Sequence, residues 1–292
     1  RLVAVKAPRG EIYARDGEIL AANELVYTLS LSYLGLGDQD NVVDNLAKLL
    51  QSYYPEVDKK FIEEKINLQK YRLFEPLIIM RDIPWELVVE LEENRQILPG
   101  VTITVEPLRS YPEGALAGHV MGYIHSINPE ELARNESSKY SINSLIGKAG
   151  IEKQYEKELR GKDGARRVEV DARGRPIREL LTMEPNPGNN IHLTLDMDLQ
   201  KVLEKSMDEV LQQLQGRYPK AKVGSVVVLN VKTGEILAMC SRPVLNPDDW
   251  KGKLSMEKAS YYYPPGKYDP MNPGAEINRA LQESYPPGST FK

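Results

Sequence analysis

The sequence has few of the residues that build metal centres, disulfide frameworks or membrane spans. Among its 292 residues are one cysteine, Cys240, and three histidines without metal-ligand spacing. A single cysteine excludes an internal disulfide framework and a cysteine-based zinc cluster. No apolar run reaches the roughly 18 residues of a transmembrane helix. The net charge of −4 provides no basic face, so we expect no nucleic-acid partner, and no motif indicates a cofactor.

The composition is that of a globular protein with enough apolar material for a sizeable core. Hydrophobic residues make up 41% of the chain and charged residues 27%, which excludes a disordered chain. At roughly 150 residues per domain, the length suggests two domains. A cluster of proline and glycine at 184–188 is the best boundary. It predicts one domain over residues 1–185 and a second over residues 186–292.

Hydrophobic periodicity predicts an α+β fold for the first domain. Residues 1–34 indicate short strands and turns, because apolar and polar residues alternate and Asp16-Gly17 is typical of a hairpin. Residues 40–98 indicate helices with apolar stripes, and residues 101–105 alternate as a strand.

The second domain is predicted to open with a long amphipathic helix. Apolar residues repeat at three and four positions over 199–214, and Asp196 is a natural N-cap. The apolar run at 225–231 predicts a strand buried on both faces, and a turn at 232–234 leads to its partner. Residues 243–275, rich in proline, tyrosine and asparagine, predict a long loop.

The last residues are the strongest candidate for chemistry. Ser289 and Lys292 follow Pro287-Gly288, and this spacing at the start of a helix places the hydroxyl and the amine on one face. A serine is a poor nucleophile without an adjacent base, and a helix N-terminus supplies N–H groups for an oxyanion. We therefore predict Ser289 as an acylating nucleophile and Lys292 as its base.

Two other segments contain parts of the same pattern, and we interpret both as structural. Ser255 and Lys258 share the spacing, but about one accidental match is expected in such a chain, and Ser255 lies in a polar segment with no preceding turn. Lys232-Thr233-Gly234 matches a motif of serine acyltransferases. In those enzymes the motif lies on a strand that follows the serine. Here it precedes Ser289 and is predicted at a hairpin tip, so an ordinary turn with glycine at positive φ is the simpler interpretation.

Three further groups are interpreted as structural features. His119, His125 and His192 are expected in the core or on the surface and not at a metal. The arginines between 166 and 178 predict a solvated hairpin. Tyr261-Tyr262-Tyr263 either line a groove or pack a long loop, and the sequence leaves both open.

Several blocks, in this order, resemble a class B penicillin-binding protein, a bacterial peptidoglycan D,D-transpeptidase. The blocks are Arg9-Gly10-Glu11-Ile12-Tyr13, Tyr111-Pro112, Gly118-His119-Val120-Met121-Gly122-Tyr123, Gly147-Lys148-Ala149-Gly150-Ile151-Glu152, Thr194-Leu195-Asp196, Gly234-Glu235-Ile236-Leu237-Ala238-Met239, and Asn278-Arg279-Ala280 before Pro287-Gly288-Ser289-Thr290-Phe291-Lys292. One departure is Ala14, where the family usually has aspartate. The insertion at 40–98 resembles the elongation-type subgroup, which serves rod-shaped growth.

This resemblance implies a fold and a reaction. The fold is an elongated N-terminal pedestal with a helical head at about 40–98, followed by the start of a transpeptidase domain of the serine β-lactamase-like kind. In the reaction, Ser289 attacks the penultimate D-Ala carbonyl of a peptidoglycan stem peptide and Lys292 takes its proton. D-Ala leaves, and a neighbouring amine resolves the acyl-enzyme. β-Lactam antibiotics acylate Ser289 as substrate mimics.

The resemblance also implies partners and a location. The partners are a glycan polymerase of the SEDS family and elongation scaffold proteins. The location is the outer face of the cell membrane, held by a single anchor before Arg1. The family's Ser-x-Asn motif and Lys-Thr-Gly strand follow the active serine and do not occur here. We therefore expect these residues to belong to a longer protein and to be inactive by themselves.

The residues by themselves leave two alternative functional classes open. A β-lactam sensor or β-lactamase is also acylated at Ser-x-x-Lys, although the N-terminal blocks argue against it. A non-enzymatic pedestal that docks proteins of cell-wall synthesis is the other alternative.

Overall fold

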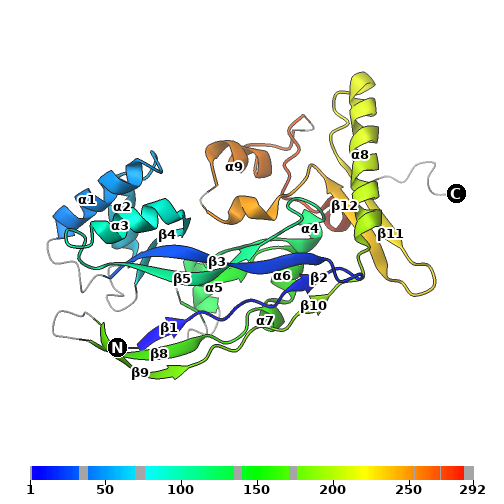
Figure 1. Ribbon diagram of the computed structural model, residues 1–292. Coiled ribbons are helices and arrows are strands. Elements are labelled where there is room, and N and C mark those ends of the chain that lie inside the picture. Colours follow the sequence, from blue (N-terminus) through cyan, green and yellow to red (C-terminus); the bar gives the residue numbers. More distant parts are fainter. Residues whose placement is uncertain are drawn as a thin grey trace. The chain divides into compact units, whose positions relative to one another are not determined.

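The structure is a computed structural model that describes residues 2–32, 39–69, 76–134, 140–141, 143–170, 176–252, 254–269 and 271–285. The chain forms two compact units, each assembled from separate stretches of sequence (Figure 1). Unit 1 comprises residues 1–8, 23–108 and 162–187, and unit 2 comprises residues 9–22, 109–161 and 188–292. The predicted α+β class is confirmed, whereas the domain boundary at 185 stays a prediction.

Unit 1 consists of two groups of antiparallel strands and three helices. The first group is β1 (Leu2–Val5), β8 (Gly164–Val170) and β9 (Pro176–Met183), paired in that order. The second group is β4 (Leu77–Ile83) with residues 23–31 of the long β3 (Ile19–Leu31) and residues 101–108 of β5 (Val101–Ser110). The helices are α1 (Gln39–Gln51), α2 (Lys59–Gln69) and α3 (Trp85–Glu93). The described part of the arginine-rich segment lies in β8 and β9, which pair as predicted, and Arg166 and Arg167 are exposed. Arg173 and Arg175 lie outside the described residues.

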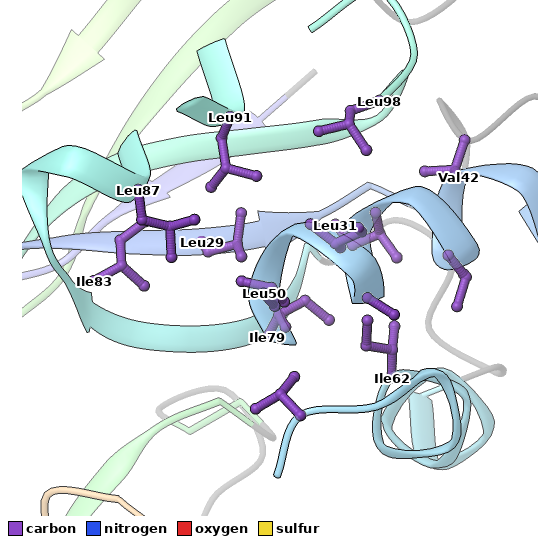
Figure 2. Packing of buried hydrophobic residues seen from close by; sticks show 14 of the residues in the cluster. Leu29, Leu31, Val42, Leu50, Ile62, Ile79, Ile83, Leu87, Leu91 and Leu98 are labelled. Carbon is purple, nitrogen blue, oxygen red and sulfur yellow. The ribbon is translucent and has the colours of Figure 1, made fainter. Parts of the chain in front are cut away.

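The core of unit 1 lies between the three helices and the strands β3 and β4. Figure 2 shows Leu50 of α1 and Ile62 of α2 beside Leu29 and Ile79 of the strands. The apolar stripes predicted for the first and third helices are confirmed, because their members are buried. These members are Val42, Val43, Leu46 and Leu50 on α1, and Leu87, Val88 and Leu91 on α3.

The segment predicted as helical contains a strand that its periodicity does not indicate. β4 pairs with β3 and buries Ile79 and Ile83. A short apolar run does not by itself distinguish a strand from a buried helix. Here the long-range pairing with β3 decides in favour of the strand.

Unit 2 combines short elements from both halves of the sequence. Its strands are β2 (Ile12–Tyr13), β6 (Ile124–Ser126), β7 (Leu145–Gly147), β10 (Ile191–His192), β11 (Gly224–Leu229) and β12 (Ile236–Arg242). Its helices are α4 (Gly118–Met121), α5 (Pro129–Arg134), α6 (Gly150–Gln154), α7 (Glu156–Leu159), α8 (Met197–Arg217), the 3₁₀ helix η2 (Pro247–Trp250), α9 (Met256–Tyr262) and α10 (Arg279–Gln282). Met121 and Leu159 share one core with Leu195 and Met197, so early and late segments bury each other.

The long helix α8 begins where the sequence predicts. The Asp196 carboxylate accepts a hydrogen bond from the N–H of Leu199 at 3.0 Å, which satisfies a free donor of the first turn. The helix lies along the β11–β12 hairpin (Figure 1) and continues through Gly216 to Arg217.

The prediction that the first strand of this hairpin is buried on both faces is wrong. Val227 is 39% exposed and Leu229 is 52% exposed, whereas Ala238, Met239 and Cys240 on β12 are buried. An apolar run becomes fully buried only where neighbouring chain covers both faces. In the described part of the chain β11 pairs with β12 alone.

The predicted loop at 243–275 also contains regular structure. Pro247 opens the 3₁₀ helix η2, and the hydroxyl of Ser255 caps α9. Trp250 and Tyr262 from these two helices are buried against Tyr123, whose ring centroid lies 3.9 Å from that of Trp250. Aromatic packing therefore orders a segment whose proline content indicates only irregular chain.

Candidate active site

Ser289 and Lys292 lie outside the described residues, which end at Tyr285. The structure describes the segment that leads to them, from Pro273 through α10 to Tyr285. The contacts of this segment show which parts of unit 2 hold the chain immediately before the predicted nucleophile.

Arg279, the first residue of α10, is buried. It contacts other residues of its own segment and one residue of β12. Its backbone N–H donates to the hydroxyl of Ser241 at 2.9 Å, and its guanidinium donates to the carbonyl oxygen of Pro273 at 2.5 Å. Its Nε lies 3.5 Å from a carboxylate oxygen of Glu283. The side chain of Asn278 caps the helix by accepting from Ala280 N–H. A buried guanidinium needs such partners, because an unpaired buried charge is costly.

His119 of α4 holds the same segment from another side. Its Nε2 lies 2.8 Å from the carbonyl oxygen of Ala275, and a carbonyl only accepts, so Nε2–H is the donor. Burial lowers the pKa of His119 to about 4, with smaller contributions from Arg279 and Arg242. The ring is therefore neutral at physiological pH. The carbonyl oxygen of His119 in turn accepts from the Asn278 amide at 3.4 Å.

Glu204 of α8 joins three parts of unit 2 through one buried carboxylate. Oε1 accepts from Ala117 N–H at 2.8 Å and from the Gln200 amide at 2.7 Å. Oε2 accepts from the Arg242 guanidinium at 3.0 Å. Gln200 also exchanges two hydrogen bonds with the backbone of Met239 on β12. This network links the segment before α4 to α8 and to the strand that carries Ser241.

A second buried network connects two of the sequence blocks within unit 2. Arg9 binds Glu152 at 2.6 Å and Glu156 at 2.7 Å. Arg109 binds the other oxygen of Glu152 at 2.6 Å and donates to the carbonyl oxygen of Gly10 at 2.7 Å. Glu152 is 0% exposed, so both arginines are required to compensate its buried charge.

The second Ser-x-x-Lys pair is occupied by structural contacts. The Ser255 hydroxyl accepts from Lys258 N–H at 3.2 Å as the N-cap of α9, and the Lys258 amine binds Asp249 at 2.5 Å. The sequence prediction of a polar loop here is wrong, because Ser255 begins a helix. The interpretation of this serine as structural agrees with its role as a cap.

Lys232-Thr233-Gly234 forms the turn of the β11–β12 hairpin, as predicted. Gly234 has a φ of 78°, which favours glycine. Lys232 and Thr233 are exposed, and the N–H of Lys232 donates to the side chain of Asn230 at 3.0 Å.

The remaining candidates have structural surroundings. His192 is exposed and stacks on Tyr13 with ring centroids 4.8 Å apart. Tyr261 and Tyr262 donate to Val244 and Asp249, which favours the packing interpretation of the tyrosine run. In the part of the chain that the structure describes, no group of His, Cys, Asp or Glu could hold a metal ion. No described helix has the length and apolar character needed to cross a membrane.

Sequence reasoning did not assign a role to Glu204, Arg242 or Ser241. The only indication of such a role in the sequence is that a polar residue occurs among apolar neighbours, as Glu204 does in the long helix. Asn278 and Arg279 belong to a sequence block that resembles the family, but the block itself does not indicate which residues they contact.

Two family models match the chain. The penicillin-binding protein dimerisation domain matches residues 4–193. The penicillin-binding protein transpeptidase domain matches residues 224–292, a range that contains Ser289 and Lys292.

A curated relative and solved structures are also similar. The peptidoglycan D,D-transpeptidase MrdA of Acinetobacter baumannii is 34% identical over 295 residues, which cover 100% of this chain and 40% of that protein. The complex between penicillin-binding protein PBP2 and MreC from Helicobacter pylori matches with a TM-score of 0.72 and 29% identity, covering 100% of this chain and 50% of that one. A structure on the coordination of polymerization and crosslinking by a peptidoglycan synthase complex matches with a TM-score of 0.61 and 30% identity, covering 96% and 44%. The chain thus spans 40% of the length of this curated relative.

Proposed function

We propose that this chain, which belongs to the penicillin-binding proteins, is part of a class B, elongation-type peptidoglycan D,D-transpeptidase that cross-links peptidoglycan through an acyl-enzyme on Ser289. The observation that supports the proposal is the match of the transpeptidase family over residues 224–292, a range that includes Ser289 and Lys292.

The proposed reaction proceeds in two acyl transfers. The Ser289 hydroxyl oxygen attacks the carbonyl carbon of the penultimate D-Ala of a stem peptide, while the neutral Lys292 amine accepts the hydroxyl proton. The C–N bond to the terminal D-Ala breaks as Lys292 passes this proton to the departing nitrogen, and D-Ala leaves as the free amine. An amine of a neighbouring stem peptide then attacks the ester, which forms the cross-link and releases the Ser289 hydroxyl.

The described contacts support Ser289 over the other serine with the same spacing. The hydroxyl of Ser255 caps a helix and the amine of Lys258 is paired with Asp249, so both groups already have structural roles. Lys232 lies at an exposed hairpin tip, which supports a structural role for that turn.

The experiment is acylation by fluorescent penicillin in the protein extended to the length of its relatives. We expect mass spectrometry to locate the adduct on the peptide that contains Ser289. Ser289→Ala should abolish labelling. As a control, Lys232→Ala should change the acylation rate by less than about threefold, below roughly 1 kcal/mol of barrier. An adduct on the Ser255 peptide, or no adduct on the folded wild-type protein, contradicts the proposal.

The proposed partners follow from what the related structures contain. One of them holds PBP2 with MreC, and another is a peptidoglycan synthase complex. We propose that this protein likewise binds an elongation scaffold protein and a glycan polymerase of the SEDS family, and that β-lactams bind as substrate mimics. We place it at the outer face of the cell membrane with a single N-terminal anchor, where its substrate lies.

A further inference from the structure

The short helix α4 and the residue directly before it contact three separate segments of unit 2. The N–H of Ala117, directly before it, donates to Glu204 of α8 at 2.8 Å. A Cβ atom at Gly118 would lie 1.9 Å from the carbonyl oxygen of Leu245, so the two backbones are in close contact. His119 donates to Ala275 at 2.8 Å. Residues that the dimerisation family covers therefore contact the segment before Ser289 directly.

The position of α4 is fixed at a conformational cost. Ala117 has a φ of 53°, in the left-handed region that residues with a Cβ rarely adopt. Such a residue is conformationally strained and persists only where its surroundings hold it. Here the buried carboxylate of Glu204 holds Ala117 in this conformation by accepting a hydrogen bond from its N–H. Strained residues with several tight contacts are found preferentially where geometry matters for function.

Contacts lead from α4 to the end of the described chain. Asn278 donates to the carbonyl oxygen of His119 and caps α10. Arg279 of that helix lies 3.5 Å from Glu283, and Glu283 accepts from the hydroxyl of Tyr285. Tyr285 is the fourth residue before Ser289 in the sequence. These hydrogen bonds and this ion pair hold the segment at both ends of α10.

We propose that His119 is a positioning residue for Ser289, because its ring holds the backbone at Ala275 and thereby fixes the chain that presents the nucleophile. The inference rests on the proposed function and deepens it. It assigns to a residue of the dimerisation region a role in acylation without contact to substrate. Catalytic groups depend strongly on placement, and an error of about 1 Å can cost about a hundredfold in rate.

The test compares two substitutions of similar size that differ in hydrogen bonding. His119→Gln keeps an N–H donor for the carbonyl oxygen of Ala275, and His119→Met removes it while keeping an unbranched side chain in the buried site. His192→Leu is the matched control, since His192 is exposed and stacks on Tyr13. Each variant is made in the protein extended to the length of its relatives. The acylation rate is measured over a series of fluorescent penicillin concentrations.

Saturation separates binding of penicillin from the acylation step. We expect His119→Met to lower the limiting acylation rate about tenfold or more while the dissociation constant of the non-covalent complex stays within about twofold. His119→Gln should restore the rate to within about threefold of wild type, and His192→Leu should not change it. Thermal melting of each variant identifies any that does not fold. If His119→Met does not fold, His119→Leu replaces it, because leucine also removes the donor to the carbonyl oxygen of Ala275, and the same outcomes apply to it.

The outcomes distinguish this inference from the proposed function. A wild-type protein that is not acylated at Ser289 contradicts the proposed function. A wild-type protein that is acylated, with His119→Met acylated at the same limiting rate despite a lower melting temperature, contradicts the positioning role and leaves the proposed function intact. A glutamine variant as slow as the methionine variant also contradicts it.

Discussion

Gly118 leaves no room for a side chain between α4 and the segment before η2. A Cβ at this position would lie 1.9 Å from the carbonyl oxygen of Leu245 and 3.2 Å from a carbon of the Pro247 ring. A backbone carbonyl cannot move aside as the end of a flexible side chain can. The requirement for glycine is therefore set by a neighbour far along the sequence.

We expect Gly118→Ala to lower the free energy of unfolding by about 1–3 kcal/mol, the usual cost of forcing extra volume into a packed site. Gly216→Ala on α8 is the control, because nothing lies within 4 Å of its added Cβ. There, alanine should stabilise by up to about 1 kcal/mol through helix propensity. Urea denaturation measures both, and equal effects of the two substitutions would show that the close approach at Gly118 does not exist.

His119 should also make unit 2 sensitive to acid. Burial lowers its pKa from 6.5 to about 4, so the unfolded chain binds this proton more readily than the folded one. Stability linked to this group is present above pH 6.5 and is lost as the pH falls from 6.5 towards 4. His119→Gln removes the titration. Its melting temperature should fall less than that of wild type between pH 7 and pH 4.5, by about 3 °C or more, and equal falls would contradict the assignment.

At the scale of elements, α9 depends on a cap that resembles a catalytic motif. The hydroxyl of Ser255 accepts from Lys258 N–H at 3.2 Å. We expect Ser255→Ala to cost about 1 kcal/mol of stability and Ser255→Asp, which keeps a capping oxygen, to cost less. Neither should alter penicillin acylation by more than about twofold. A large loss of acylation in the alanine variant at unchanged stability would be evidence for a chemical role.

In the β11–β12 hairpin the observed burial of the side chains differs from the burial that the apolar sequence pattern predicts. Its turn follows from Gly234, whose positive φ is a local property. The exposure of Leu229, at 52%, does not follow from the apolar run in which it lies. Burial depends on which chain packs against a strand, whereas the turn depends only on its own backbone.

At the scale of the whole molecule, unit 2 contains residues from both sides of the predicted domain boundary. Unit 1 lies entirely within residues 1–187, but residues 9–22 and 109–161 cluster with residues 188–292. The core around Met121 and Leu159 is completed by Leu195 and Met197. Segments on the N-terminal side of the boundary therefore take part of their core from beyond it.

This arrangement predicts uneven protection in a fragment of residues 1–185. Amides of α1 and β4 should exchange as slowly as in the 292-residue chain, because their core lies within the fragment. Amides of α4 should exchange at least about tenfold faster, because Glu204 and Ala275 are missing. Hydrogen exchange of both chains measures this. Equal protection of α4 in the two would show that the pedestal folds without the later segments.

Local features were predictable from the sequence. The stripes of α1 and α3, the Asp196 cap and the turn at Lys232-Thr233-Gly234 each depend on residues within a few positions of one another, so period and turn chemistry specify them. The family was predictable because its blocks occur in order along the chain. Ser289 and Lys292 were predictable as candidates from their spacing together with the preceding Pro287-Gly288.

Only the tertiary structure decided which distant residues meet. It determined that 77–83 is a strand, through pairing with β3, and that Glu204 within an apolar stripe is satisfied by Ala117 and Arg242. It also placed His119 against Ala275, 156 residues away. A sequence pattern reports whether a residue is polar or apolar, whereas its hydrogen-bond partner is selected by the packing of the complete unit.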